Sequence, residues 1–315
     1  MEFVWLIAGF LLLIKGADWM VQAASKLARS FGVPTMVIGL TVIALGTSMP
    51  EAAIGIMSAV SKTNQLTLGD VIGSSVANIA LIIGFSALLK PLKIQPRTIS
   101  RDIPLSIIVQ ALFAVFLLTG KGIDRLESII LIAGLILFLV YLTRSSKAAI
   151  AHPKDSLGEP EEKPVSVKRG RSFLITLIGM AGVIGGSKLI VDNAILIAAG
   201  FGLSAAMIGV TIVALGTSLP ELVVSIVSVS RKEHELMVGN IIGSNIFNIL
   251  FVVGVSGTIY PIEFTEKIWV GLVSMLVLSI LFLIMAKRSN RISRPEGTIL
   301  LVFYAAFIIL AVFTS

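Results

Sequence analysis

Long apolar runs follow one another along the whole chain, each closed by charged, proline or glycine residues. They lack the strict alternation of the ten-residue strands in an outer-membrane barrel. Most of them reach the roughly 20 apolar residues that an α-helix needs to span a bilayer. The pattern therefore predicts an all-α polytopic membrane protein with ten transmembrane helices, at about residues 2–24, 31–61, 67–89, 102–120, 125–143, 172–198, 202–230, 237–259, 266–286 and 296–314.

The composition excludes a soluble domain. Of the 315 residues 56% are hydrophobic and 14% charged, against roughly 45–50% and about 25% in soluble proteins. The net charge of +7 would suggest a nucleic-acid partner in a soluble protein. Here we assign it to loops at a membrane surface and expect no nucleic-acid partner. The absence of cysteine from the sequence excludes disulfides and thiolate metal sites.

The distribution of lysine and arginine predicts the orientation. The five odd-numbered connections between the predicted helices hold nineteen of the 25 basic residues, and the even-numbered ones hold four. Loops rich in Lys and Arg stay in the cytoplasm. We therefore expect a plasma-membrane protein with a cytoplasmic linker at 144–171 and both termini outside.

The chain contains an internal repeat at an offset of 170 residues. Residues 31–58 align without gaps to 201–228 with fourteen of 28 positions identical, and 69–84 align to 239–254 with seven of 16 identical. Because each half has an odd number of helices, the two halves must have opposite orientations. This predicts two inverted-topology five-helix repeats, 1–143 and 172–315, an arrangement typical of transporters.

Each repeat has a carboxylate inside an apolar run. The segments Gly-Thr-Ser-Met-Pro-Glu at 46–51 and Gly-Thr-Ser-Leu-Pro-Glu at 216–221 also combine glycine with proline. Such residues break a helix and free backbone carbonyls, which is tolerated in a membrane only where they line a cavity or are buried. A buried acid in a membrane helix indicates a transport pathway by default.

The helices that follow supply more oxygen donors. Ser74 and Asn78 lie four residues apart on one helical face, as do Ser244 and Asn248. Carboxylates, amides, hydroxyls and carbonyls are ligands for hard ions such as Na⁺ and Ca²⁺. Two close carboxylates also need a cation, since otherwise one of them would be expected to take a proton.

The paired Gly-Thr-Ser-x-Pro-Glu and Gly-[Asp/Asn]-x-Ile-Gly-Ser-x-x-x-Asn segments resemble the two α-repeats, here 39–84 and 209–254, of the sodium/calcium exchanger family within the calcium/cation antiporter superfamily. The resemblance implies that Glu51 and Glu221 bind Ca²⁺ directly and share Na⁺ sites. The remaining ligands that it implies are the carbonyls of Thr47 and Thr217 for Ca²⁺, Asn78 and Asn248 at the centre, and Ser48, Ser74, Ser218, Ser244 and the carbonyls of Ala44 and Ala214 for Na⁺.

The sequence departs from the family pattern at two positions. Several exchangers have aspartate where Asn248 stands, so this site has one acid fewer, and three Na⁺ would exceed the charge of two glutamates. Asp70 stands where the family usually has asparagine and where the second repeat has Asn240. From the sequence, Asp70 either caps a helix or attracts ions.

Alternatives to sodium/calcium exchange remain. A proton-coupled calcium exchanger or another cation exchanger would use the same carboxylates, and a channel could use the same oxygens. An intramembrane hydrolase would need an activated nucleophile, and the Gly-Thr-Ser-x-Pro segments lack the second glycine of a nucleophile elbow. We therefore expect a secondary transporter and not an enzyme, with no resident cofactor and no obligatory protein partner. Its partners would be Na⁺, Ca²⁺ and the lipid bilayer.

Two ion pairs within helices are also predicted from spacing. Lys15 with Asp18 and Lys188 with Asp192 are expected to pair within their helices.

Overall fold

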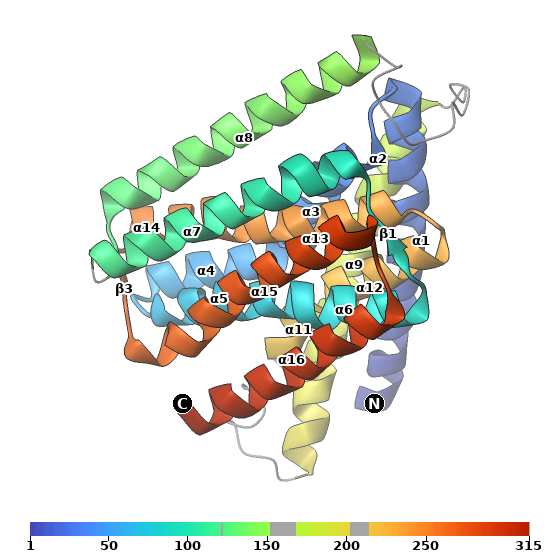
Figure 1. Cartoon of the computed structure of the whole chain (residues 1–315). Helices are drawn as coiled ribbons and strands as arrows, with labels where there is room; N and C mark the ends of the chain where they lie inside the picture. Colours follow the sequence, from blue (N-terminus) through green and yellow to red (C-terminus); the bar gives the residue numbers. More distant parts are fainter. Residues whose placement is uncertain (121, 152–167, 202–213, 315) are drawn as a thin grey trace.

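The computed structural model describes residues 1–120, 122–151, 168–201 and 214–314 (Figure 1). Apart from four strands of two residues each, the regular elements of these ranges are helices. The first half of the predicted helix 202–230 and most of the predicted linker 144–171 lie outside the described residues.

The described part of the chain contains eight helices that are long and apolar enough to cross a membrane. A ninth candidate is a pair of helical segments, Thr35–Thr47 and Met49–Val60, bent by 49° at the break between them. A shorter apolar helix, α12, covers Leu219–Ser230. The chain is thus a helical multi-pass membrane protein. The eight long spans are Glu2–Phe31, Leu66–Leu89, Thr98–Thr119, Arg125–Ser145, Arg169–Gly200, His234–Ile259, Trp269–Ser289 and Arg294–Ala311.

Several spans are built from short pieces joined by π-helical turns. These turns interrupt the regular hydrogen-bond ladder and are found frequently at functional sites. The first seven pieces are α2 (Thr35–Ile38), η1 (Gly39–Ile43), α3 (Ala44–Thr47), α4 (Met49–Val60), α5 (Gln65–Val76), η2 (Ala77–Ile83) and α6 (Gly84–Leu89). The second repeat has α11 (Ala214–Thr217), α12, α13 (His234–Phe247), η6 (Asn248–Val253) and α14 (Gly254–Ile259).

The other helices are longer. They are α1 (Glu2–Phe31), η3 (Thr98–Asp102) with α7 (Ile103–Thr119), α8 (Arg125–Ala151), α9 (Arg169–Gly200), the 3₁₀ turn η7 (Glu266–Ile268) with α15 (Trp269–Ser289), and α16 (Arg294–Thr314). The largest extensions past the predicted boundaries are at the ends of α1 and α8, where Lys and Arg, which are good helix formers, continue the helix. Thus α1 includes Lys26 and Arg29, beyond its predicted end at residue 24, and its C-cap Gly32 lies in the left-handed region with φ 66°.

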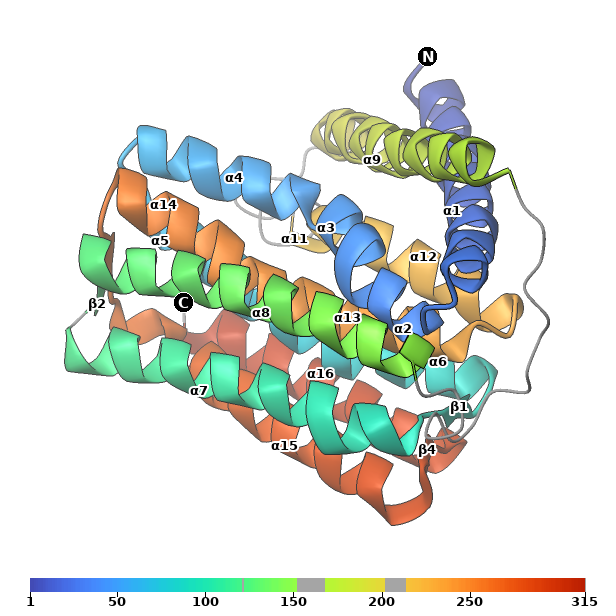
Figure 2. The ribbon, with the colours of Figure 1, turned by 90° about the horizontal axis from the view of Figure 1, so that it is seen from above.

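Helices α1 and α9 lie side by side at one edge of the molecule (Figure 2). Glycines allow their backbones to touch, since a Cβ added to Gly16 would lie 2.8 Å from the carbonyl oxygen of Gly179. The two helices share an apolar cluster that includes Leu13, Met20 and Val183. The cluster also includes residues of η1, α12 and α13, and it is separate from the larger core. The α1–α9 pair therefore packs against η1, α12 and α13.

The connections gather at two ends of the helices. At one end Arg29 pairs with Glu233, and strands β1 (Leu92–Lys93) and β4 (Arg291–Ile292) pair antiparallel. At the other end β2 (Gly122–Ile123) pairs with β3 (Ile262–Glu263), and the Asn64 side chain donates to the Tyr260 carbonyl. The first end thus joins odd-numbered connections and the second joins even-numbered ones.

Candidate cation site

Two helix breaks position the site. Ser48 and Ser218 separate α3 from α4 and α11 from α12, with Pro50 and Pro220 in the first turn of the following helix. Proline is favoured there, because the first turn does not use its missing N–H. The last carbonyls of a helix lack partners within that helix. The breaks therefore place carbonyl ends of α3 and α11 beside the starts of α4 and α12.

Glu51 and Glu221 follow these breaks in the first turns of α4 and α12, and both are 1% exposed. A helix N-terminus stabilises a carboxylate. In the described part of the chain, neither glutamate forms an ion pair with a basic side chain. Two buried like charges within electrostatic range of each other favour binding of a cation between them.

A close backbone contact brings α13 against the first broken helix. A Cβ on Gly39 would lie 2.5 Å from the Leu236 carbonyl oxygen, and one on Gly239 would lie 2.6 Å from the Met36 carbonyl oxygen. Only glycine fits at such a crossing. As a result, the Thr47 hydroxyl donates to Asn240 Oδ1 at 3.0 Å and lies 3.4 Å from the Ser244 hydroxyl.

The two glutamates differ in their hydrogen bonds. Glu221 Oε1 accepts from the Ser48 hydroxyl at 3.3 Å and from the Ser244 hydroxyl at 3.4 Å. Both carboxylate oxygens of Glu51 and Oε2 of Glu221 are buried without a hydrogen-bond donor in the described part of the chain. Buried carboxylate oxygens are normally paired or bound to a metal. These three oxygens could therefore accept a cation as ligands.

The two predicted asparagines lie at matching π-helical turns. Asn248 begins η6 and its amide donates to the Ser74 hydroxyl at 3.1 Å, whereas Asn78 lies in η2 and donates to Asn245 Oδ1 at 2.9 Å. Their own Oδ1 atoms are buried without a donor among the described residues. The amide groups thus cross-link the two repeats and leave carbonyl oxygens free to accept a ligand.

Asp70 is not a helix cap. It is the sixth residue of α5, whose N-cap is Asn64, so the capping interpretation is wrong. The Thr217 hydroxyl donates to Asp70 Oδ1 at 3.4 Å, while Asp70 Oδ2 is buried without a donor in the described ranges. Asp70 therefore lies at the site, against the second helix break.

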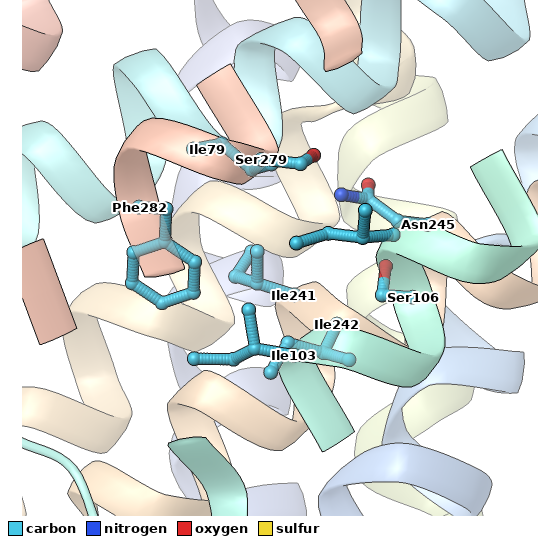
Figure 3. Close-up of a pocket in the computed structure, with 9 residues that line it drawn as sticks. Ile79, Ile103, Ser106, Ile241, Ile242, Asn245, Ser279 and Phe282 are labelled. Carbon is cyan, nitrogen blue, oxygen red and sulfur yellow. The ribbon is translucent and has the colours of Figure 1, made fainter. Parts of the chain in front are cut away.

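The narrow pocket drawn in Figure 3 is lined by Asn245 among other residues. Its lining is mostly apolar, with Ile241 and Phe282 on one side and the polar groups of Ser106, Asn245 and Ser279 on the other. It has no carboxylate among its lining residues. The pocket therefore does not itself offer a cation site, and Asn245 forms part of its wall.

The structure brings most of the predicted residues together. Hydrogen bonds connect Ser48, Glu221, Ser244 and Thr47, and a second set connects Ser74 with Asn248. Ser218 lies at its helix break, 4% exposed, and Ala44 begins α3. Ala214 begins α11, but its side chain lies outside the described residues.

Sequence reasoning missed Asn240 and Asn245, which complete the contacts of Thr47 and Asn78. The available signal was that both stand in the second repeat at an offset of 170 from Asp70 and Ser75. Among the described residues no three His, Cys, Asp or Glu side chains cluster as a metal site. The donors are instead mixed oxygens, as Na⁺ and Ca²⁺ prefer.

One of the two predicted ion pairs is wrong. Asp18 does not pair with Lys15 but with Arg231, at 2.5 Å, and also accepts from Gln22. Arg231 reaches across from the end of α12, a contact that spacing along one helix could not reveal. Lys188 and Asp192 pair at 3.3 Å, as predicted.

The family model described as sodium/calcium exchanger protein matches residues 1–144 and 171–313. A putative antiporter, CaxA, of Alkalimonas amylolytica is 38% identical over 311 residues, covering 96% of each chain. The sodium/calcium exchanger MaX1 of Methanosarcina acetivorans is 30% identical, covering 98% of this chain and 97% of its own.

Solved structures of an exchanger are also similar to this chain. The sodium-calcium exchanger NCX_Mj, in crystals soaked with 2.5 mM Na⁺ and 1 mM Sr²⁺, superimposes with a TM-score of 0.84 at 31% identity. The match covers 98% of this chain and 97% of that one. The whole described fold is therefore similar to a known exchanger.

Proposed function

Because this chain belongs to the sodium/calcium exchanger family, we propose that it is a secondary active antiporter that exchanges Na⁺ for Ca²⁺ across the membrane. The observation that carries the proposal is the pair Glu51 and Glu221. Both are almost fully buried at helix breaks, and three of their four oxygens lack a donor among the described residues. Such carboxylates need a cation, and the surrounding oxygens suit Ca²⁺ and Na⁺.

We propose that ten helices form two inverted five-helix repeats, 1–143 and 172–315, joined by the linker 144–171. The ungapped offset of 170 residues supports this arrangement. The matching breaks at Ser48 and Ser218 support it as well, since both have ψ near zero. An ion site between such repeats, near the membrane midplane, is exposed to one side at a time.

We assign the ligands by ion. Glu51 and Glu221 with the carbonyls of Thr47 and Thr217 would bind Ca²⁺, with Asn78 and Asn248 at the centre. The two glutamates also serve Na⁺, so the two ions compete for the same oxygens and cannot bind fully together. The further Na⁺ ligands would be Ser48, Ser74, Ser218, Ser244 and the carbonyls of Ala44 and Ala214. No resident cofactor or protein partner is required by this scheme.

Alternating access needs a part that moves against the site. The α1–α9 pair is the candidate, because the apolar cluster through which it packs against η1, α12 and α13 is separate from the main core. The contact between α1 and α9 themselves is lined by glycine. Sliding of these two helices past α2–α4 and α11–α12 would open the site alternately to each side.

We place the protein in the plasma membrane with the odd-numbered connections in the cytoplasm and both termini outside. The nineteen basic residues of those connections support this orientation. Contacts between these connections, such as the ion pair of Arg29 with Glu233 and the pairing of β1 with β4, support their lying at a common end of the helices.

The test uses proteoliposomes loaded with Na⁺ and supplied with ⁴⁵Ca²⁺ outside, at constant pH. We expect uptake that requires the outward Na⁺ gradient and is abolished in Glu51→Gln and Glu221→Gln. Glu266→Gln is the matched control, since Glu266 is exposed in the η7 turn and lies away from the site. Uptake that ignores Na⁺ and follows an imposed pH gradient would refute sodium coupling and favour a proton/calcium exchanger.

A further inference from the structure

Asp70 and Asn240 occupy equivalent positions in the two repeats, 170 residues apart. Each contacts the threonine of the other repeat's broken helix. Asn240 Oδ1 accepts from Thr47 at 3.0 Å, and Asp70 Oδ1 accepts from Thr217 at 3.4 Å. The same structural position is thus filled once by a neutral amide and once by a carboxylate. The repeat is symmetric in contacts but not in charge.

The glutamates show the same asymmetry. Glu221, in the half with Asn240, accepts hydrogen bonds from Ser48 and Ser244. The equivalent donors for Glu51 would be Ser218 and Ser74, but neither Glu51 oxygen accepts a hydrogen bond from the described residues. Ser74 donates instead to the Val71 carbonyl and accepts from Asn248. The half that holds Asp70 therefore has both more negative charge and fewer hydrogen-bond donors.

Three buried carboxylate oxygens remain without a donor in that half, in the ranges that the structure describes. They are the two oxygens of Glu51 and Oδ2 of Asp70. Both Asp70 and Glu221 are among the charges that act on Glu51. Burying an unpaired carboxylate is costly, and two near one another cost more. Cations bound beside these oxygens would offset this charge.

We infer that Asp70 is a third acidic residue beside the ion site, not a ligand of the same ion as both glutamates, and that it strengthens Na⁺ binding next to Thr217. This rests on the proposed function and extends it. Three carboxylates neutralise three monovalent ions, whereas Glu51 and Glu221 alone would leave one charge in excess. The negative charge that is absent at position 248, in η6, is thereby supplied by a residue of α5.

The experiment compares wild type with Asp70→Asn. Asparagine keeps an oxygen that accepts from Thr217, as Asn240 does for Thr47, so the variant removes the charge and preserves the contact. We expect the half-saturating Na⁺ concentration for Na⁺-driven ⁴⁵Ca²⁺ release to rise roughly tenfold, which is the effect of one charge-dependent interaction of moderate strength. A purely structural role of Asp70 would leave this concentration unchanged.

Asn240→Asp is the complementary variant. If a carboxylate at this position binds cations, adding one to the other half lowers the half-saturating Na⁺ concentration. Na⁺-dependent thermal stabilisation of the purified proteins gives a second readout without transport, and we expect a smaller shift in Asp70→Asn than in wild type. Wild-type Na⁺ dependence in both variants, with unchanged thermal shifts, would overturn the inference.

The outcomes separate this inference from the proposed function. Wild-type protein that moves no Ca²⁺ in response to Na⁺ contradicts the proposed function, whatever the variants do. Wild-type protein that exchanges the two ions while Asp70→Asn behaves identically contradicts only the role of Asp70.

Discussion

Ser48 and Ser218 have almost the same backbone conformation, with φ −83° and ψ 9° at the first and φ −84° and ψ 0° at the second. Each ends a four-residue helix and precedes a helix with proline in its first turn. In both repeats the following turn carries the buried glutamate. The two breaks therefore have the same structure, and they share the local sequence Gly-Thr-Ser-x-Pro-Glu.

The proline of each break is expected to matter for transport more than for folding. In Pro50→Ala the backbone gains an N–H and can continue as an unbroken helix, which would withdraw the α3 carbonyls from the site. We expect Ca²⁺ uptake to fall at least roughly tenfold while the purified protein stays monodisperse; a tenfold loss corresponds to about 1.4 kcal/mol. Pro153→Ala, outside the predicted helices, is the control. Normal uptake by Pro50→Ala would show that the break does not depend on proline.

The glycine crossing of the first broken helix with α13 should not tolerate a side chain. In Gly39→Ala the new methyl group would meet the Leu236 carbonyl oxygen at 2.5 Å. Overpacking of this kind costs typically about 1–3 kcal/mol. We expect a lower midpoint of thermal unfolding and weaker Ca²⁺ binding, because Asn240 and Ser244 move away from Thr47.

The matched control for this substitution is Gly170→Ala, since Gly170 is exposed near the start of α9. Equal thermal stability of the two variants would contradict the tight crossing.

The amide pair of Asn78 and Asn245 should be needed for a rigid site. Asn245→Leu removes the acceptor at 2.9 Å and leaves a buried donor of Asn78 without a partner. A buried polar group left without a partner lowers the free energy of unfolding by about 1–3 kcal/mol. We expect a lower denaturation midpoint and a raised half-saturating Ca²⁺ concentration. Asn245→Asp keeps an acceptor oxygen and should retain more stability than Asn245→Leu. A lower denaturation midpoint for Asn245→Asp than for Asn245→Leu would contradict this account.

The ion pair of Asp18 with Arg231 should affect transport kinetics more than stability. It joins α1 to the end of α12 across 213 residues at partly exposed positions, where ion pairs contribute roughly 0–1 kcal/mol. Because α1 is proposed to move against α12, we expect Asp18→Asn to change the maximal Ca²⁺ flux severalfold with little change in the thermal midpoint.

Asp192→Asn is the control for this prediction. It breaks the exposed pair with Lys188, which lies within a single helix and joins no two parts that move. Equal fluxes in Asp18→Asn, Asp192→Asn and wild type would show that the Asp18–Arg231 contact has no part in the cycle.

The sequence was sufficient to predict the elements that depend on local patterns. Apolar runs gave the helical multi-pass fold, and a carboxylate within such a run marked Glu51 and Glu221. Contacts between distant segments could not be predicted in the same way. Asn245 looked like any buried polar residue until the structure placed it against Asn78. Asp18 was assigned to Lys15 by spacing alone, whereas its partner arrives from another helix.

Asp70 shows why spacing alone is insufficient near the site. Its sequence position after a loop was compatible with a helix cap, because the start of α5 could not be fixed from the sequence. Once α5 begins at Gln65, Asp70 falls one and a half turns inside the helix and faces Thr217. The distinction between a cap and a site residue therefore depended on a shift of five residues.

The central claim is that Ca²⁺ and Na⁺ bind in turn to the same buried oxygens. Equilibrium binding of ⁴⁵Ca²⁺ to the purified protein, measured over a range of Na⁺ concentrations, tests it most directly. We predict saturable Ca²⁺ binding that Na⁺ displaces competitively and that is lost in both Glu51→Gln and Glu221→Gln. Ca²⁺ binding that is independent of Na⁺, or that survives in either variant, would contradict the claim.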